Sequence, residues 1–356
     1  MKLDLTAPAP PRSPWQRLYA LGLERRRRAW AGRAGRLGRP AVSVGNLHWG
    51  GGGKTPLVAA LSGLLRDTGR RVGILSRGYG RRGREPCVVS VGQGPLVAPE
   101  QAGDEPFLLA EQLAGVAIAV CGDRRAAARA LLARTGVDCF VLDDAFSHVK
   151  LHRDLDLLAF PAADPFAGGR LLPSGRLREP LAASRRADAA LITGLDHPDR
   201  EAASLLARAL APHGFRGASF ACGLDSSLIG PSASRHAGAP AEPPSERFLL
   251  VSGTARPGSV RQTADRLGLE VVEHLRFPDH HAYPQRSLEA IRRRAADLGA
   301  AVLTTAKDRV KLAGRLGRPL WEIVVDARPE SGFGPWVEEH LAAVEARASS
   351  SAPSGP

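Results

Sequence analysis

The feature that most constrains this chain is a glycine run that ends in lysine and threonine: Gly50, Gly51, Gly52, Gly53, Lys54 and Thr55. An apolar stretch at 41–44 precedes it and a helical pattern follows, and this order is the context of a phosphate-binding loop. Glycines let consecutive backbone N–H groups turn toward one anion, and the helix adds its positive N-terminal end. We therefore expect Lys54 to reach the outer phosphates of a nucleotide and Thr55 to face a magnesium ion.

One position departs from the usual loop pattern, because His48 stands where a glycine is normal. The context compensates for this departure. The helical pattern after the loop has Pro56 in its first turn, and its apolar residues share one face: Leu57, Val58, Leu61, Leu64 and Leu65. A glycine-rich turn that binds nothing is the alternative, and the flanking strand and helix favour the phosphate loop.

Length and composition favour a cytosolic protein with two domains. The 356 residues are 44% hydrophobic, enough for two separate cores. The four cysteines are widely scattered, which favours reduced thiols over a disulfide scaffold or a paired metal motif. No stretch approaches the roughly 20 apolar residues that span a bilayer. The net charge of +13 calls for a polyanionic partner or surface, unless it merely reflects an arginine-rich proteome.

Much of the positive charge lies in a basic amphipathic N-terminal segment, residues 1–40. Its arginines are interleaved with apolar residues, among them Trp15, Leu18, Tyr19, Leu21 and Trp30. Such a helix can lie in a membrane interface with its arginines on the headgroups. It can equally dock on its own domain, and different faces can do both. The arginine cluster follows the apolar run, so the segment is not a signal peptide.

Short apolar strands alternate with amphipathic helices along the chain, which predicts an α/β fold with a P-loop NTPase-like parallel sheet between helices and a second, smaller α/β domain. The expected strands are 72–75, 116–120, 140–142, 155–160, 189–193, 248–251, 301–305 and 323–325, with a helix near 287–298. A Pro/Ala/Ser-rich stretch divides them. The predicted units are a kinase-like core at 41–228, a linker at 229–246, the smaller domain at 247–345 and a disordered tail at 346–356.

Acidic residues at two places in the chain fit a phosphate loop. Asp143 and Asp144 follow the apolar strand 140–142, so a carboxylate emerges at the edge where nucleotide and magnesium bind. They can instead cap the next helix. Asp104 opens the helical run 107–113 and can accept a proton from an attacking hydroxyl, although the commonest use of such a residue is an ordinary helix N-cap.

Two further segments offer cations to an anionic ligand. Arg77 and Tyr79 follow the strand 72–75, where a substrate would approach, and Arg178 with Glu179 lies in the stretch 172–180. By itself each of these segments is a weak signal, since arginines in loops are commonly only solvated.

The order of the segments carries more information than any one of them. In sequence they are Val42-Ser43-Val44-Gly45-Asn46-Leu47, the glycine run with Lys54-Thr55-Pro56, Ser76-Arg77-Gly78-Tyr79-Gly80-Arg81, Gly103-Asp104-Glu105-Pro106, Leu142-Asp143-Asp144, Leu172-Pro173-Ser174-Gly175 with Arg178-Glu179-Pro180, Phe277-Pro278-Asp279-His280, and Thr304-Thr305-Ala306-Lys307-Asp308. This order resembles that of the tetraacyldisaccharide 4′-kinases of lipid A biosynthesis. The resemblance runs from about residue 13 to about residue 330.

The resemblance implies an ATP- and Mg²⁺-dependent kinase that is peripheral to the cytoplasmic face of the inner membrane, and we expect a monomer. Its substrate would be the lipid A precursor, a tetraacylated glucosamine disaccharide 1-phosphate phosphorylated at the 4′-hydroxyl. By resemblance Lys54 and Thr55 contact phosphate and magnesium, Asp143 or Asp144 holds the metal, Asp104 is the base and His280 orients it. The residues implied to line the substrate and nucleotide site are Asn46, Arg77, Tyr79, Arg178 and Glu179.

The chain departs from the family pattern at several positions. The family usually reads Asp-Asp-Gly-Phe-Gln-His where this chain has Ala145 and Ser147 in place of the glycine and the glutamine. Ala306 replaces a frequent glutamate. His280 is followed by His281, so only its position in the family pattern singles out His280 as the functional histidine. None of these changes removes a residue on which phosphoryl transfer obviously depends, so we predict an active enzyme.

Two other classes of protein compete with the kinase. A P-loop GTPase or regulatory switch would use the same loop without a lipid acceptor, but the chain has no clear Asn-Lys-x-Asp segment, and Thr305-Ala306-Lys307-Asp308 lacks the asparagine. A nucleic-acid-binding protein would explain the charge, yet it leaves Asp104, Asp143 and Asp144 without a role. We therefore expect no nucleic-acid partner.

Overall fold

The structure is a computed structural model that describes residue 5 and residues 14–49, 53–231 and 247–350. Its strands are β1 (Ala41–Gly45), β2 (Val72–Ser76), β3 (Cys87–Val91), β4 (Ala117–Val120), β5 (Cys139–Asp143), β6 (Leu155–Pro161), β7 (Ala189–Leu195), β8 (Ala218–Ile229), β9 (Phe248–Ser252), β10 (Val271–Arg276), β11 (Ala301–Thr305) and β12 (Leu320–Pro329). Within the described residues they form one twelve-stranded sheet in the order β10-β9-β11-β12-β8-β7-β6-β1-β5-β2-β4-β3.

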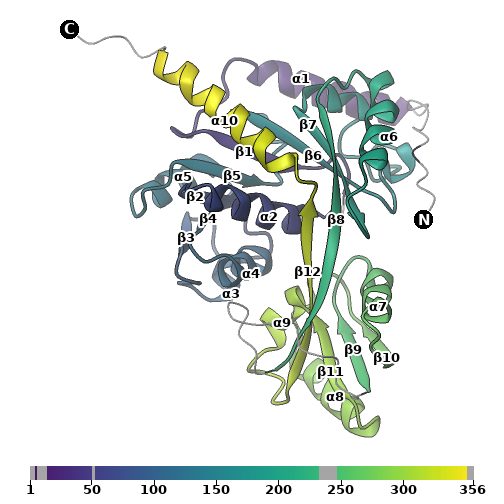
Figure 1. Ribbon diagram of the computed structural model, residues 1–356. Helices are drawn as coiled ribbons and strands as arrows, with labels where there is room; N and C mark the ends of the chain where they lie inside the picture. The colour runs from purple at the N-terminus through teal and green to yellow at the C-terminus, as the bar shows by residue number, and fades with distance from the viewer. Residues whose placement is uncertain (1–4, 6–13, 50–52, 232–246, 351–356) are drawn as a thin grey trace.

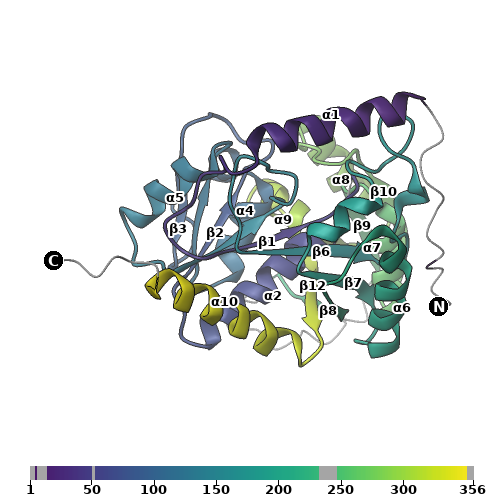
Figure 2. The same ribbon diagram turned by 90° about the horizontal axis from the view of Figure 1, so that it is seen from above.

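Helices cover both faces of this sheet (Figures 1 and 2). The α-helices are α1 (Pro14–Trp30), α2 (Lys54–Asp67), α3 (Pro99–Ala102), α4 (Asp104–Gln112), α5 (Arg124–Leu132), α6 (Arg200–Leu210), α7 (Pro257–Arg266), α8 (Gln285–Asp297), α9 (Ala306–Leu312) and α10 (Phe333–Ser350). The 3₁₀ turns are η1 (Ala167–Gly169), η2 (Leu181–Arg186) and η3 (Ala211–His213).

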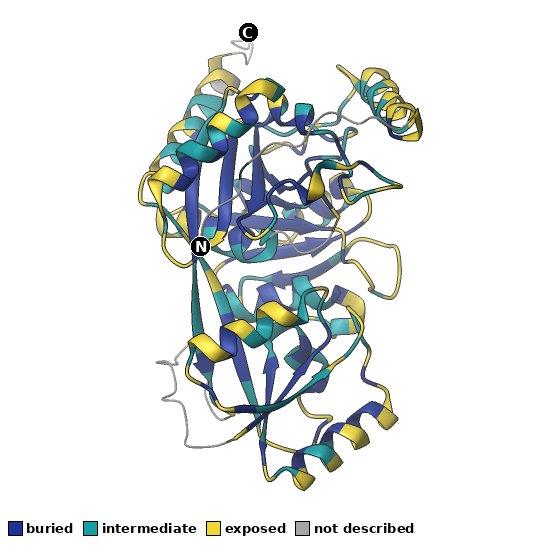
Figure 3. Cartoon of the chain, turned by 90° about the vertical axis from the view of Figure 1, so that its right-hand side faces the viewer, coloured by how far each residue is buried: buried dark blue, intermediate teal, exposed yellow. Residues whose placement is uncertain are grey.

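The N-terminal lobe is a three-layer α/β core. Strands β1, β2, β4, β5, β6 and β7 run parallel, and their apolar side chains are buried on both faces, as expected for strands between two helical layers (Figure 3). One face packs against α2, α4 and α10, and the other against α5 and α6. All of the predicted strands of this lobe are present, which confirms the predicted α/β class.

The second lobe is a smaller α/β unit built on the same sheet. Strands β9, β10, β11 and β12 are parallel, with α8 and α9 against one face and α7 against the other. The long strands β8 and β12 pair antiparallel from Cys222–Pro329 to Ile229–Glu322 and pass from one lobe to the other (Figure 1). The chain therefore crosses between the lobes along a hydrogen-bonded ladder.

The structure corrects the predicted organisation at three points. The sheet is not purely parallel, because β3 and the β8–β12 pair are antiparallel and β3, β8 and β10 were not predicted. The position predicted to begin the linker, Ile229, is the last residue of β8, and 232–246 lie outside the described residues. Helix α10 packs on the N-terminal lobe instead of the smaller domain, and it remains helical through 346–350, where a tail was predicted.

Helix α1 has two different faces. Tyr19 and Ala20 pack against the N-terminal lobe beside the cluster that contains Phe146. Trp15, Leu18 and Leu21 are instead exposed to solvent, with exposed fractions of 70%, 60% and 54%. Both interpretations of the basic segment are thus compatible with the helix, while 1–4 and 6–13 lie outside the described residues.

The docking of α10 can be tested at Phe333. This side chain is fully buried and contacts the Phe220 ring edge-on, with a 5.3 Å distance between the ring centroids. We expect Phe333→Ala to lower the free energy of unfolding by about 3–5 kcal/mol in urea titration, since it leaves a cavity under the helix. The exposed Leu96 is the control, and its change to alanine should cost no more than about 0.5 kcal/mol. Equal effects would contradict the assigned docking.

Candidate active site

A cavity of about 1700 Å³ lies between the two lobes at the carboxyl edge of the parallel strands. Parallel strands end at one edge, so residues distant in sequence converge there. Among the described residues, those lining the cavity include Lys54, Thr55, Arg77, Tyr79, Asp143, Asp144 and Arg178 from the N-terminal lobe and Arg256, His280 and Lys307 from the second. Asn46, Asp104 and Glu179 are not among the lining residues, but Asn46 contacts Lys54 and Asp104 contacts His280, and both of these partners line the cavity.

The phosphate loop leads directly into α2, as the sequence predicts. Gly53 has a φ of 72°, and a Cβ there would come 3.0 Å from Thr193 Oγ1, so this position needs glycine. Lys54 Nζ donates to Asn46 Oδ1 at 3.1 Å and lies 3.7 Å from Asp144 Oδ1. The amide thus holds the lysine at the end of β1. The remaining loop glycines, 50–52, lie outside the described residues.

Asp144 is held as a carboxylate by cations. Arg178 donates to both of its oxygens, at 2.9 and 2.7 Å, and to Asn46 Oδ1 at 2.5 Å. Burial alone would raise the pKa of Asp144, but the hydrogen bonds from Arg178 and the charge of Lys54 outweigh it and lower the pKa to about 2. Asn46, Lys54, Asp144 and Arg178 therefore form one network.

Asp143 has the opposite environment. Ser76 Oγ, at the end of β2, donates to its Oδ2 at 3.0 Å, and Arg124 Nη2 donates to its backbone carbonyl at 3.4 Å. Burial, followed by the charges of Glu105 and Asp144, raises its pKa to about 6. Its buried Oδ1 has no hydrogen-bond partner among the described residues. The sequence predicted no role for Ser76 or Arg124, although Ser76 directly follows the predicted strand 72–75 and the strand-end argument could have found it.

These residues fit a magnesium ion held mainly by a nucleotide. Thr55, Asp143 and Asp144 offer the oxygen ligands that Mg²⁺ prefers, and Mg²⁺ is commonly held by one or two carboxylates plus phosphates and water. No cluster of three or more His, Cys, Asp or Glu able to hold a metal occurs within the described ranges. A site completed by phosphate oxygens needs no such cluster.

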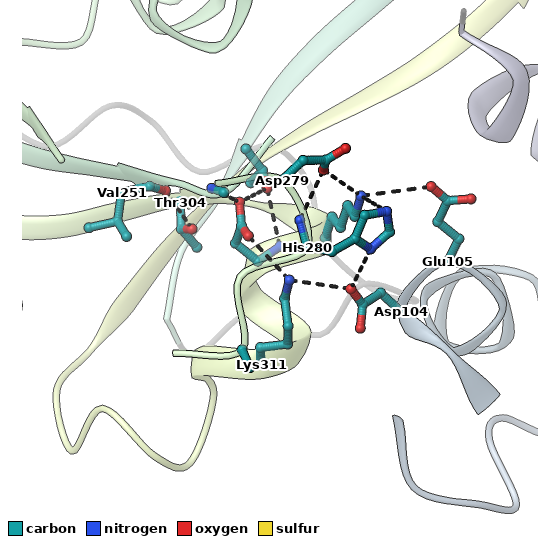
Figure 4. A network of polar contacts seen from close by, with 12 residues as sticks. Asp104, Glu105, Val251, Asp279, His280, Thr304 and Lys311 are labelled. Atoms are coloured by element: carbon teal, nitrogen blue, oxygen red, sulfur yellow. Dashed lines mark hydrogen bonds and ion pairs between the residues drawn. The ribbon is translucent and has the colours of Figure 1, made fainter. Parts of the chain in front are cut away.

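The Asp104–His280 pair joins the two lobes (Figure 4). Gly103, with a φ of 89°, occupies the N-cap of α4, so Asp104 is the first helical residue and not the cap. Its Oδ2 lies 3.3 Å from His280 Nδ1 and 3.3 Å from Lys311 Nζ. Burial would raise the pKa of Asp104, but the hydrogen bond from His280 and the charge of Lys311 outweigh it and lower the pKa. The Tyr79 ring lies 5.1 Å from that of His280.

Comparisons with known proteins identify the family. The profile described as "Tetraacyldisaccharide-1-P 4'-kinase" matches residues 12–342. The chain belongs to this family. It is 44% identical over 322 residues to the tetraacyldisaccharide 4'-kinase of Anaeromyxobacter sp. (strain Fw109-5), covering 86% of this chain and 82% of that protein. The kinase of Syntrophus aciditrophicus (strain SB) is 38% identical over 328 residues, 87% and 84% of the two chains.

A solved structure agrees with this result. The "apo" form of LpxK from Aquifex aeolicus in complex with ATP superposes with a TM-score of 0.73 at 30% identity, covering 92% of this chain and 98% of that one. The chain is therefore a kinase of the tetraacyldisaccharide 4'-kinase family with its P-loop α/β fold. No described helix has both the length and the apolar character needed to cross a bilayer.

The environment of Glu179 differs from the one that the resemblance implied, which was a position lining the substrate and nucleotide site. Its side chain is buried and accepts a hydrogen bond from Ser147 Oγ at 2.6 Å. Arg186 also donates to it, and Arg27 of α1 lies 3.8 Å away. The carboxylate is only 3% exposed and both of its oxygens accept hydrogen bonds from the protein, so the structure places no direct contact with substrate there. Ser147, which replaces the family's glutamine, is engaged with this buried acid.

This arrangement predicts that Glu179 acts on stability. Glu179→Gln should lower the free energy of unfolding by about 1–3 kcal/mol, because it weakens charge-assisted hydrogen bonds to buried partners. Urea titration measures this change, and the KM for ATP should stay near that of the unaltered protein. A direct ligand contact would instead raise the KM and leave stability unchanged.

Proposed function

We propose that this kinase transfers the γ-phosphate of ATP to the 4′-hydroxyl of a tetraacylated glucosamine disaccharide 1-phosphate. The observation that carries the proposal is the cavity between the lobes, which is lined by Lys54, Asp143 and Asp144 on one side and by His280, the partner of Asp104, on the other. Membership of the family supplies the acceptor. Phosphoryl transfer requires mainly positioning and charge neutralisation, and this set of groups suits both.

On the nucleotide side, we assign the phosphates to the loop 50–53 and Lys54. Thr55, Asp143 and Asp144 would hold Mg²⁺, which neutralises negative charge on the phosphates when it is bound. Asn46 and Arg178 contact Lys54 and Asp144 and keep both groups at the end of the sheet. A bound cation would favour the ionised form of the buried Asp143, whose pKa is raised in its absence.

On the acceptor side, we assign Asp104 as the base that receives the proton of the attacking hydroxyl. Both of its contacts described above fall on Oδ2, which leaves Oδ1 to accept a proton. His280 would hold that carboxylate in place, and Tyr79 and Arg77 would line the approach of the sugar phosphate. The competing switch reading leaves the Asp104–His280 pair without a role, and we do not favour it.

The exposed face of α1 supports a peripheral position on a membrane, at the cytoplasmic face of the inner membrane where this precursor would be met. Trp15, Leu18 and Leu21 project from one side of a helix that also carries several arginines. An amphipathic helix of this kind places apolar side chains into the interface and cations on anionic headgroups. We propose that the protein acts there as a monomer.

The transfer can be tested with γ-labelled ATP and the tetraacylated acceptor in detergent micelles. We expect labelled lipid from the unaltered protein and none from Lys54→Ala. Asp104→Asn should lower kcat by roughly 10²–10⁴ while the KM for ATP changes little, because the carboxylate acts on the acceptor. Full activity of Asp104→Asn would exclude it as the base, and transfer by Lys54→Ala would exclude the nucleotide assignment.

The membrane contact can be tested by cosedimentation with vesicles that contain phosphatidylglycerol. Exchanging both Leu18 and Leu21 for glutamate should lower the partition coefficient at least about tenfold, since burying one leucine contributes roughly 1.5 kcal/mol or more. Leu96→Glu is the matched control, because Leu96 is also exposed but lies outside α1. Binding that survives the α1 change would show that another surface holds the membrane.

A further inference from the structure

Helix α9 carries two lysines, four residues apart, that contact the Asp104–His280 pair at its two ends. Lys311 Nζ lies 3.3 Å from Asp104 Oδ2, and Lys307 Nζ lies 3.1 Å from His280 Nε2. Residues four apart share one helix face, and this face packs against α4. Lys307 was predicted only as part of the segment 304–308, and the sequence predicted no role for Lys311. The four-residue spacing of the two lysines was the sequence signal that could have indicated a shared role.

Lys311 is placed between two carboxylates. Its side chain is only 10% exposed, and Nζ lies 3.6 Å from Asp308 Oδ1 as well as near Asp104. Asp308 is fully buried and accepts hydrogen bonds from the Gly253 N–H at 2.9 Å and from Thr305 Oγ1 at 2.8 Å. Because Asp308 is tied to the backbone of the second lobe, it fixes the ammonium, and the ammonium in turn fixes Asp104.

Lys307 determines which ring nitrogen of His280 carries the proton. A lysine ammonium can only donate hydrogen bonds, so the His280 Nε2 facing it must accept. The proton of the neutral ring therefore sits on Nδ1, which donates to Asp104 Oδ2 at 3.3 Å. Lys307 is itself held by Asp279 Oδ1 at 3.1 Å and lies 3.9 Å from Glu105. With Nε2 occupied, the ring is not free to act as the base.

We propose that Lys311 and Lys307 are positioning residues of the phosphoryl transfer: Lys311 keeps Asp104 ionised, and Lys307 selects the His280 tautomer that orients it. This inference rests on the proposed role of Asp104. The charged and titratable groups around Asp104 are His280 from the β10–α8 loop, Lys311, Lys307 and Asp308 from α9, Tyr283 and Asp279 beside them, and Glu105 on α4 itself.

The inference predicts a change in the pH profile of kcat. Removing the Lys311 charge raises the pKa of Asp104, so the base form is lost at a higher pH and the acidic limb moves upward. An opposite charge at this distance commonly lowers a carboxylate pKa by about 1–3 units, so a shift of roughly 1 pH unit or more is expected. Lys311→Arg should restore much of the original profile.

The variant must not leave Asp308 as an unpaired buried charge, because that alone can prevent folding. We therefore combine Lys311→Met with Asp308→Asn, which removes both charges together.

The second variant, Lys307→Met, concerns a side chain at the cavity wall. It should lower kcat at least about tenfold without changing the KM for ATP. In ¹⁵N spectra of labelled histidine it should convert part of the His280 signal from the Nδ1–H to the Nε2–H form.

A matched control separates positioning from simple docking of α9 on α4. Arg309 lies on the same helix, pairs with Glu111 of α4 and with Glu322 Oε2 at 2.8 Å, and has no contact with Asp104 or His280. Arg309→Met is combined with Glu322→Gln, because Glu322 is buried, and the double variant should leave the pH profile and the histidine spectrum as they are. If it reproduces the changes of the lysine variants, the lysines only dock the helix and the inference fails.

Asp104→Asn distinguishes failure of this inference from failure of the proposed function. If Asp104→Asn is inactive while the folded Lys311→Met/Asp308→Asn protein keeps the original acidic limb, the lysine role is wrong and the base assignment stands. If Asp104→Asn retains full kcat, the base assignment itself fails, and the inference fails with it. A shifted limb together with the altered histidine signal supports the inference.

Discussion

The antiparallel ladder between β8 and β12 is the constraint on which the site depends. It carries the chain from the N-terminal lobe to the second lobe and back, pairing residues from Cys222–Pro329 to Ile229–Glu322. Backbone hydrogen bonds therefore hold α4 of one lobe opposite α9 and the β10–α8 loop of the other. Asp104 and His280 meet across this junction although 176 positions separate them in the chain.

Charge is distributed unevenly over the acids of the cavity. The cations Arg178 and Lys54 stabilise the carboxylate of Asp144, and a hydrogen bond from His280 and the charge of Lys311 stabilise that of Asp104. Burial and like charges leave Asp143 with a raised pKa of about 6. Under the proposed function, a cation that arrives with the nucleotide would favour the ionised form of this acid.

Helix α1 is connected to the same stretch that supplies Arg178. Tyr19 donates to the Arg178 carbonyl at 3.1 Å, and Arg27 lies 3.8 Å from the buried Glu179. Ser147 donates to the same carboxylate, so this short side chain is engaged with a buried acid. The helix proposed to meet the membrane thus packs directly on the segment that fixes Asp144.

The sequence by itself determined the α/β class, most of the strands, the phosphate loop before α2, and the acids at strand ends, because apolar periodicity and local motifs specify these features. Only the tertiary structure decided the burial of Glu179, the return of α10 to the core, and the antiparallel β8–β12 crossing. It also decided that Lys311 contacts Asp104 and that Lys307 contacts His280. These depend on contacts between distant segments, and no local pattern records which side chains will meet across a sheet.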